Sequence, residues 1–187
     1  MQNSMRYPKA IVFMKIGYHC DESLEEIIKR KKEEENKTGK IFWGYGGSFL
    51  HPLTQLKPFI QKALQRKLNP VLLLSLTPSK YIAQPKLAKE YSPDRKIWFP
   101  LPKGVLVKGS KFAIICRNLK KVNVKINLNV YEVAIGKNKG RPLGEVIKAR
   151  VDKACGFLNP RYAHYKRREV KISYIAEIIR PYAVFLK

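Results

Sequence analysis

The chain has 187 residues, of which 38 are Lys or Arg and 14 are Asp or Glu, so its formal net charge is +24 at pH 7. A hydrophobic content of 45% excludes a disordered basic tail, because such tails lack the apolar residues that form a core. The uncompensated positive charge favours a polyanionic partner, and nucleic acid is the leading class.

The N-terminal part of the chain begins with a strand and a helix. Ala10–Gly17 is apolar and β-branched, which predicts a buried strand. Ser23–Asn36 is predicted to be a helix that Asp21 or Ser23 caps, since the inward-facing Leu and Ile residues recur at helical spacing. The second half of this helix, KRKKEEENK, carries both signs of charge and predicts a solvated face whose charges pair with one another.

A second strand, a second helix and a third strand follow. Lys40–Tyr45 is predicted to be a short strand, and Pro52–Lys67 a helix that Pro58 should kink or split. Val71–Leu76 is apolar on both faces, which is typical of a central strand covered by helices on both sides. This alternation predicts a βαβαβ-like α/β half over residues 1–76.

Prolines interrupt residues 77–109, which we predict to be an irregular connection with one short helix near Pro85–Glu90. The chain then turns to strands. Lys111–Cys116 is the first, and Val122–Val130 alternates apolar and polar residues without a break. The alternation predicts that the apolar residues point inward and that four polar residues point outward, namely Asn123, Lys125, Asn127 and Asn129.

The last part of the chain should hold one helix and two strands. Pro142–Cys155 is predicted to be a helix that Gly156 ends. Val170–Ile179 and Tyr182–Leu186 are predicted to be closing strands, separated by a turn or bulge at the intervening Arg-Pro. The fold class is therefore α+β (mixed α/β). Residues 1–187 should form one compact domain, in which the α/β half joins a mainly antiparallel, β-rich and basic half over residues 110–187.

The strongest candidate site is basic and aromatic. Asn159–Arg168 reads NPRYAHYKRR, so cations that bind phosphates alternate with flat rings on which unpaired bases can stack. The loop Gly136–Arg141 is a second phosphate clamp, because glycines let its backbone approach a ligand closely. The predicted nucleic-acid-binding residues are Lys137, Lys139, Arg141, Arg161, Tyr162, Tyr165, Lys166, Arg167 and Arg168.

An alternative site lies between the second strand and the second helix. Tyr45, Gly46, Gly47, Ser48 and His51 occupy a position where backbone N–H groups often cradle phosphate. The spacing matches neither GxxxxGK[ST] nor GxGxxG. This alternative predicts an α/β enzyme with a nucleotide or phosphate pocket, such as a nuclease or a nucleotide-processing enzyme, with Ser48 and His51 as the candidate catalytic residues.

Cysteines, histidines and carboxylates give little sign of a metal or a cofactor, and we predict neither. The three cysteines, which include no CxxC pair, argue against a disulfide framework and a zinc site and favour a cytoplasmic location. Metal-dependent nuclease chemistry needs converging carboxylates, yet Lys148 should pair with Glu145 and Asp152 on the predicted helix. The apolar runs are too short to span a membrane, so no membrane partner is expected.

The leading functional hypothesis is a nucleic-acid-binding protein. RNA or single-stranded nucleic acid is favoured over duplex DNA, because tyrosines are interleaved with the cations and no helix-turn-helix or zinc-finger pattern occurs. A subunit of a ribonucleoprotein or defence complex, in contact with other protein subunits, is a further form of this hypothesis. Whether the protein is an enzyme stays open at this point.

Overall fold

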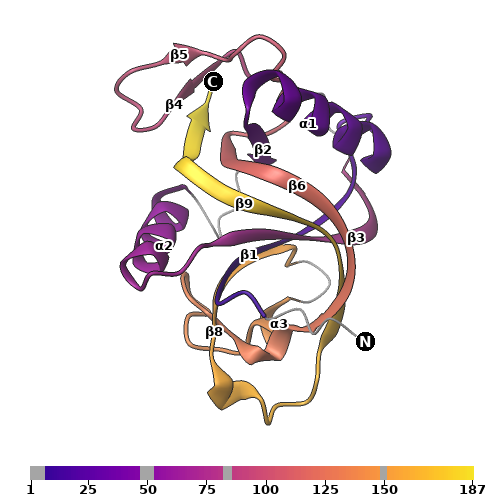
Figure 1. Cartoon of the computed structure of the whole chain (residues 1–187), viewed down its shortest axis with the longest axis vertical. Helices are drawn as coiled ribbons and strands as arrows, with labels where there is room; N and C mark the ends of the chain where they lie inside the picture. The colour runs from indigo at the N-terminus through magenta and orange to yellow at the C-terminus, as the bar shows by residue number, and fades with distance from the viewer. Residues whose placement is uncertain (1–6, 47–52, 82–85, 148–150) are drawn as a thin grey trace.

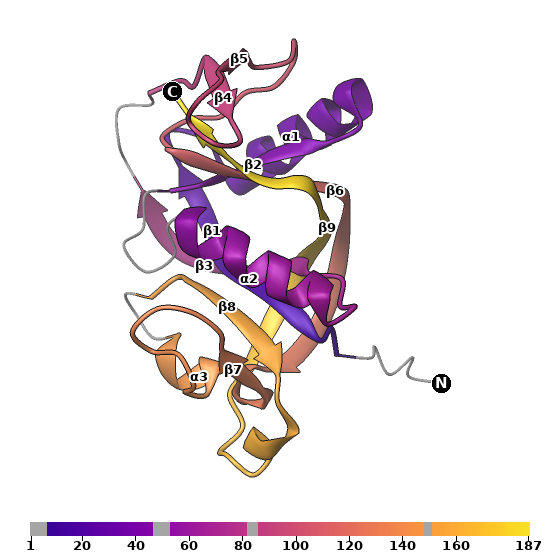
Figure 2. The same ribbon diagram turned by 90° about the vertical axis from the view of Figure 1, so that its left-hand side faces the viewer.

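The computed structural model describes residues 7–46, 53–81, 86–147 and 151–187, and the fold is α+β as predicted (Figures 1 and 2). Its helices are α1 (Leu24–Thr38), α2 (Leu53–Gln65) and α3 (Leu143–Val146), with 3-10 turns η1 (Leu128–Val130) and η2 (Pro160–Tyr162). Its strands are β1 (Ala10–His19), β2 (Ile41–Tyr45), β3 (Val71–Tyr81), β4 (Glu90–Ser92), β5 (Phe99–Pro100), β6 (Phe112–Asn127), β7 (Tyr131–Val133), β8 (Lys153–Leu158) and β9 (Glu169–Leu186). They form one sheet with the main order β2-β6-β9-β3-β1-β8-β7, beside which β4 pairs with β5 and β9.

β1 and β3 lie at the centre of the sheet and run parallel, with Ile11 opposite Val71. Successive side chains point to opposite faces, and both faces are buried, so Leu72 packs in one core cluster and Leu73 in another. The predicted central strand is confirmed, but its covering differs from the prediction. α2 covers one face, whereas the curled ends of β6 and β9, with β7 and the short α3, cover the other.

α1 begins at the predicted cap. The hydroxyl of Ser23 accepts a hydrogen bond from the Glu26 N–H, and the Glu26 carboxylate accepts one from the Ser23 N–H. This reciprocal capping box satisfies two N–H groups that a helix start leaves without partners. Gly39 ends the helix in the left-handed conformation, with φ of 71°.

The charged half of α1 is only partly the solvated face that its sequence predicts. Lys31 and Glu34 are buried and form an ion pair, with 2.8 Å between Nζ and Oε2. The pair faces Phe42 of the edge strand β2, whose N–H donates to Glu34 Oε1 at 2.6 Å and whose carbonyl accepts from Lys31 Nζ at 2.6 Å. Leu106 approaches the same pair with its carbonyl, 3.1 Å from Lys31 Nζ, and its N–H, 3.5 Å from Glu34 Oε2. The ion pair thus supplies the hydrogen-bond partners that a neighbouring strand would otherwise give to the backbone of Phe42.

The first half of the chain has the predicted alternation of strands and helices, but its strands are not all parallel. β2 pairs antiparallel with β6 at the edge of the sheet, so only β1 and β3 are parallel among the described strands. α2 runs through Pro58 without a break. Its apolar face, with Leu56, Phe59 and Ile60 buried, holds it on the core, and proline removes only one helical N–H donor.

β6 and β9 are long, bent strands that pass side by side from one end of the molecule to the other (Figures 1 and 2). The sequence predicts each as two shorter strands. The predicted bulge in β9 is confirmed, because Ala183 pairs with Ile114 and Ile178 pairs with Cys116, so four residues of β9 lie opposite one of β6. The peptide bond between Arg180 and Pro181, within this bulge, is cis.

The predicted helix over Pro142–Cys155 is wrong. α3 has four residues, and β8 follows as a strand that pairs antiparallel with β1. Gly156, expected to end the helix, pairs with Ile11 inside this strand. The apolar spacing of the segment suits either structure, and the open edge of β1 selects the strand.

The connection over residues 77–109 has more structure than its prolines predict. β3 continues to Tyr81, and the short strands β4 and β5 lie where no strand was predicted. Residues 86–90 hold no helix, so the described part of the predicted short helix is wrong. Among the described residues no helix is long and apolar enough to cross a membrane.

Candidate functional site

The loop between β7 and α3 carries the first group of predicted phosphate-binding residues, and we call residues 136–141 the basic loop. Val133 closes it, because the Val133 N–H donates to the Arg141 carbonyl and the Val133 carbonyl accepts from the Gly140 N–H, each at 2.9 Å. Gly136 and Gly140 have φ of 80° and 83°, a conformation that favours glycine. This closure leaves the loop's lysines exposed.

The second group follows β8, and we call residues 159–168 the basic segment. Asn159 begins η2, because its Oδ1 accepts a hydrogen bond from the Arg161 N–H at 3.1 Å. At the other end, the Arg168 N–H donates to Asn127 Oδ1 at 2.9 Å, and Asn129 Nδ2 donates to the Lys166 carbonyl at 2.7 Å. Three asparagines therefore fix the course of the basic segment.

Two of these asparagines were predicted to point outward, and that prediction is wrong. Asn127 and Asn129 are buried, because β6 ends at Asn127 and η1 begins there, which breaks the alternation. The Asn129 N–H donates to Asn127 Oδ1 at 3.0 Å. Asparagine commonly forms this turn with the backbone two residues on, so the Asn-x-Asn spacing was the available signal.

The structure brings the basic loop and the basic segment together. The hydroxyl of Tyr162 donates a hydrogen bond to the Gly140 carbonyl, which links the two directly. Asn159 adds a second link to the strand before the loop, since its Nδ2 donates to Glu132 Oε2 at 2.6 Å. We call the two stretches together the basic end.

The predicted binding residues of the basic end are exposed, apart from the half-buried Tyr162. Tyr165 is 40% exposed and lies edge-on to Tyr162, with 5.3 Å between ring centroids. Within the described part of the chain, Arg167 is the one predicted binding cation with an ion-pair partner, Glu169, at 4.0 Å. The basic end thus presents several cations without carboxylates beside them.

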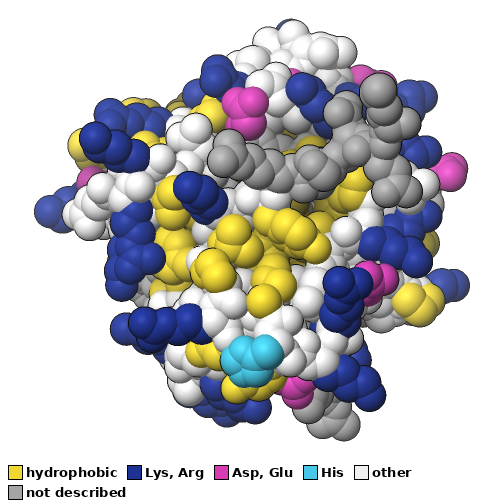
Figure 3. All heavy atoms as spheres, turned by 60° about the horizontal axis from the view of Figure 1, so that its bottom comes forward, with side chains coloured by type: hydrophobic (Ala, Val, Ile, Leu, Met, Phe, Trp, Pro, Cys, Tyr) yellow, Lys and Arg dark blue, Asp and Glu magenta, His cyan; other side chains and the backbone are white. Residues whose placement is uncertain are grey.

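Figure 3 brings forward the end of the molecule that holds α3. Lysine and arginine side chains surround a hydrophobic area on this face, and acidic side chains are few. The cations lie around the margin of the face and leave its centre apolar. This face therefore offers spaced positive charges rather than one continuous basic patch.

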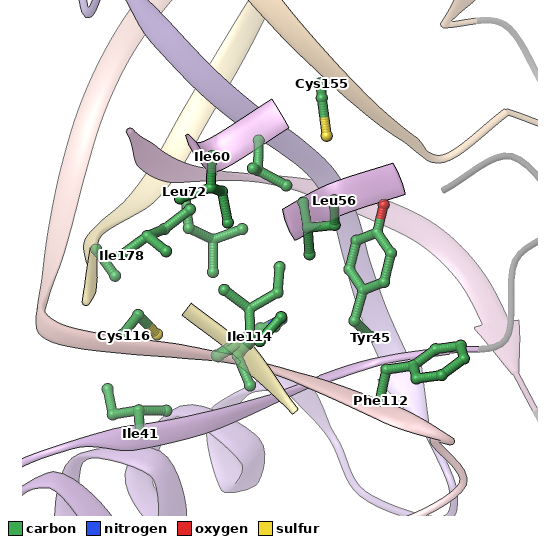
Figure 4. Close-up of a cluster of buried hydrophobic side chains, with 14 of the residues drawn as sticks. Ile41, Tyr45, Leu56, Ile60, Leu72, Phe112, Ile114, Cys116, Cys155 and Ile178 are labelled. Carbon is green, nitrogen blue, oxygen red and sulfur yellow. The ribbon is translucent and has the colours of Figure 1, made fainter. Parts of the chain in front are cut away.

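The residues of the alternative site divide between the core and a cavity. Tyr45 is fully buried in the hydrophobic cluster beside Leu56 of α2, and burial raises the pKa of its hydroxyl well above the usual value (Figure 4). Gly46 lines a cavity of about 510 Å³ at one side of the sheet. Gly47, Ser48 and His51 lie outside the described residues.

No protein family matches this chain, and no characterised protein or solved structure is detectably similar to it. In the described ranges, no three His, Cys, Asp or Glu residues are grouped so that they could hold a metal ion. Of the scarce carboxylates, Glu132 bonds Asn159 and Glu177 pairs with Arg117, which gives both a structural role.

Proposed function

We propose that the protein binds nucleic acid through its basic end. The observation that carries this proposal is the hydrogen bond from Tyr162 to the Gly140 carbonyl, because it unites two stretches whose cations the sequence alone could not place together. Phosphate groups that follow one another along a chain would meet lysines and arginines from both stretches. Release of their counterions would drive the binding.

RNA or another single-stranded nucleic acid is the preferred ligand in this proposal. Tyr165 is exposed beside Lys166 and Arg167, so an unpaired base could stack on its ring while the cations bind the adjoining phosphates. The three cysteines are buried thiols, which suits a reducing compartment such as the cytoplasm. A place within a ribonucleoprotein or defence complex is compatible with the same surface.

The test measures binding of the full chain to fluorescently labelled single-stranded RNA, single-stranded DNA and duplex DNA by anisotropy. At ~50 mM salt we expect binding that weakens steeply as salt is added. Absence of binding to all three probes would overturn the proposal.

The variant K166A/R167A locates the interface, and K86A/K89A is its control, because it removes the same charge from exposed lysines elsewhere. We expect K166A/R167A to weaken binding and to lower the slope of log K against log salt by about 1.4, since each phosphate contact to a single strand contributes about 0.7. An equal loss in both variants would show that the basic end is not the interface.

Y162F tests the link itself, because it removes the hydroxyl that bonds Gly140 and keeps the ring. We expect affinity to fall several-fold, at unchanged salt slope, since no charge is removed. Unaltered affinity would show that the link does not organise the interface.

A further inference from the structure

A cavity of about 510 Å³ lies at the carboxyl ends of the parallel strands β1 and β3. This volume falls within the range of small-molecule sites in proteins. Its position also matters, because ligands of α/β sheets commonly bind beyond the carboxyl ends of parallel strands. Residues of β1, β3, α1, β2 and the stretches 106–110 and 152–153 line it, so segments far apart in the sequence meet there.

The inner wall of the cavity is apolar and closely built. Met14, Ile16, Trp43 and Val107 contribute hydrophobic side chains to the lining. Gly17 keeps β1 close to β3, because a Cβ at this position would lie 2.6 Å from the Thr77 carbonyl oxygen. A flat, apolar group of a ligand could therefore pack against these side chains, and the close approach of β1 and β3 fixes the shape of this wall.

One edge of the cavity carries stacked aromatic rings. The rings of His19 and Tyr81 lie 5.0 Å apart at an interplanar angle of 14°. Tyr81 is 54% exposed, which leaves ring surface for a further partner. Beside them, the ammonium of Lys80 lies 5.7 Å from the centroid of the Tyr18 ring.

The lining is strongly cationic. Six Lys or Arg residues contribute to it, whereas Asp152 is the one acidic residue among the described lining positions. Glu22 pairs with Arg30 and Lys108, and Glu34 pairs with Lys31, so two carboxylates outside the lining balance part of this charge. Asp152 pairs with a fourth cation, Lys153, at 3.6 Å, so three carboxylates face six cations and a net positive charge stays at the lining. An anion in the cavity would offset this remaining charge.

We propose that the cavity binds a nucleotide, with the base against Tyr81 and the phosphate near Lys80. This ligand class combines the two features that the lining matches, a flat aromatic group and an anionic one. The proposal does not depend on the basic end. The nucleotide comes either from free solution or from a strand that is also bound at the basic end.

The first experiment titrates the full chain with adenosine, guanosine, cytidine and uridine 5′-monophosphates by calorimetry, with adenosine and inorganic phosphate as partial ligands. We expect at least one monophosphate to bind more tightly than either partial ligand. Y81A and K80A should each weaken it by roughly 10-fold, because each removes a stacking face or a charge-assisted contact. Both residues are exposed, so neither substitution should disturb folding. F99A and K89A, at another exposed aromatic residue and another exposed lysine, are the matched controls and should leave the affinity unchanged.

The second experiment repeats the anisotropy titration of labelled single-stranded RNA with Y81A and K80A. If the nucleotide belongs to a bound strand, Y81A weakens RNA binding even where free monophosphates bind poorly, which supports the proposal. If free monophosphates bind and Y81A leaves the affinity for RNA unchanged, the ligand is a free nucleotide, which also supports the proposal.

If Y81A and K80A change the affinity neither for monophosphates nor for RNA, the proposed cavity site is wrong. That result leaves the basic end standing, provided that K166A/R167A still weakens RNA binding. The reverse result, a Y81A-sensitive monophosphate site without RNA binding, would overturn the proposed function alone.

Discussion

Replacing the buried ion pair of α1 with hydrophobic residues should destabilise this protein, against the general tendency. Swapping a buried ion pair for apolar residues is often neutral or stabilising, because two desolvated charges are removed together. Here Lys31 and Glu34 also bond the backbone of Phe42 and Leu106, with donor–acceptor distances of 2.6 Å to both Phe42 groups. The double variant K31M/E34L would leave those backbone groups buried and without partners.

The expected size follows from these contacts. Each orphaned buried polar group costs about 1–3 kcal/mol, and the two short bonds of Phe42 alone give about 4 kcal/mol for K31M/E34L. K31M should lower the free energy of unfolding by a similar amount, about 3–5 kcal/mol, because it leaves the carboxylate of Glu34, which is 0% exposed, without its cation. Since 1 kcal/mol lowers Tm by about 2–4 °C in a protein of this size, each variant should melt roughly 10 °C below the parent.

Urea denaturation followed by circular dichroism measures both variants, and K32M, an exposed neighbour on the same helix, is the control. K32M should unfold within about 0.5 kcal/mol of the parent, as exposed substitutions usually do. A double variant as stable as the parent, alongside a destabilised K31M, would refute the reasoning. It would mean that the pair stabilises only itself and does not cap the edge of β2.

Three further predictions concern the cavity and the core. Burial lowers the pKa of His19, so the unfolded chain binds a proton at this histidine at a higher pH than the folded protein does, and Tm should fall as pH falls through the ordinary histidine range. Thermal melts of H19F at the same pH values should lack this fall. G17A should lower the free energy of unfolding by about 2 kcal/mol, because its Cβ would lie 2.6 Å from the Thr77 carbonyl oxygen, whereas the Cβ of G46A would lie 3.6 Å from its nearest contact and should leave stability unchanged. Equal urea midpoints for the two variants would contradict this. The three buried cysteines, whose thiol pKa values burial raises, should resist a thiol reagent in the native state and all react in urea; one fast native thiol would disprove their inertness.

The elements that sequence predicts correctly have strong local signals. β1 is a run of apolar, β-branched residues, and α1 and α2 show clear helical periodicity, with the Ser23 cap at the start of α1. β8 was missed because Val151 and Ala154 also suit a helical stripe, and the free edge of β1 is a feature of the assembled sheet. The burial of Glu34 was missed for the same reason, since an EEE run is solvated unless an edge strand needs its oxygens.

The candidate site was predictable in composition but not in arrangement. Alternating cations and tyrosines identified the basic segment, and glycines identified the basic loop. Their contact joins Tyr162 to Gly140, 22 residues apart in the sequence, which no local pattern reports. The cavity was harder to predict, because Lys15, Tyr81 and Gly46 come from three separate strands or their ends and become neighbours only in the folded sheet.

The place of β9 in the sheet limits when this protein can fold. β9 lies between β6 and β3, so the centre of the sheet is complete only after residues 169–186 have left the ribosome. Until then β3 lacks its partner on one side, and the apolar faces of β1 and β3 lack part of their cover. Such non-local pairing forms slowly and exposes surfaces that aggregate. Until β9 has been made, these two strands should therefore be prone to aggregate, although the finished sheet holds them at its centre.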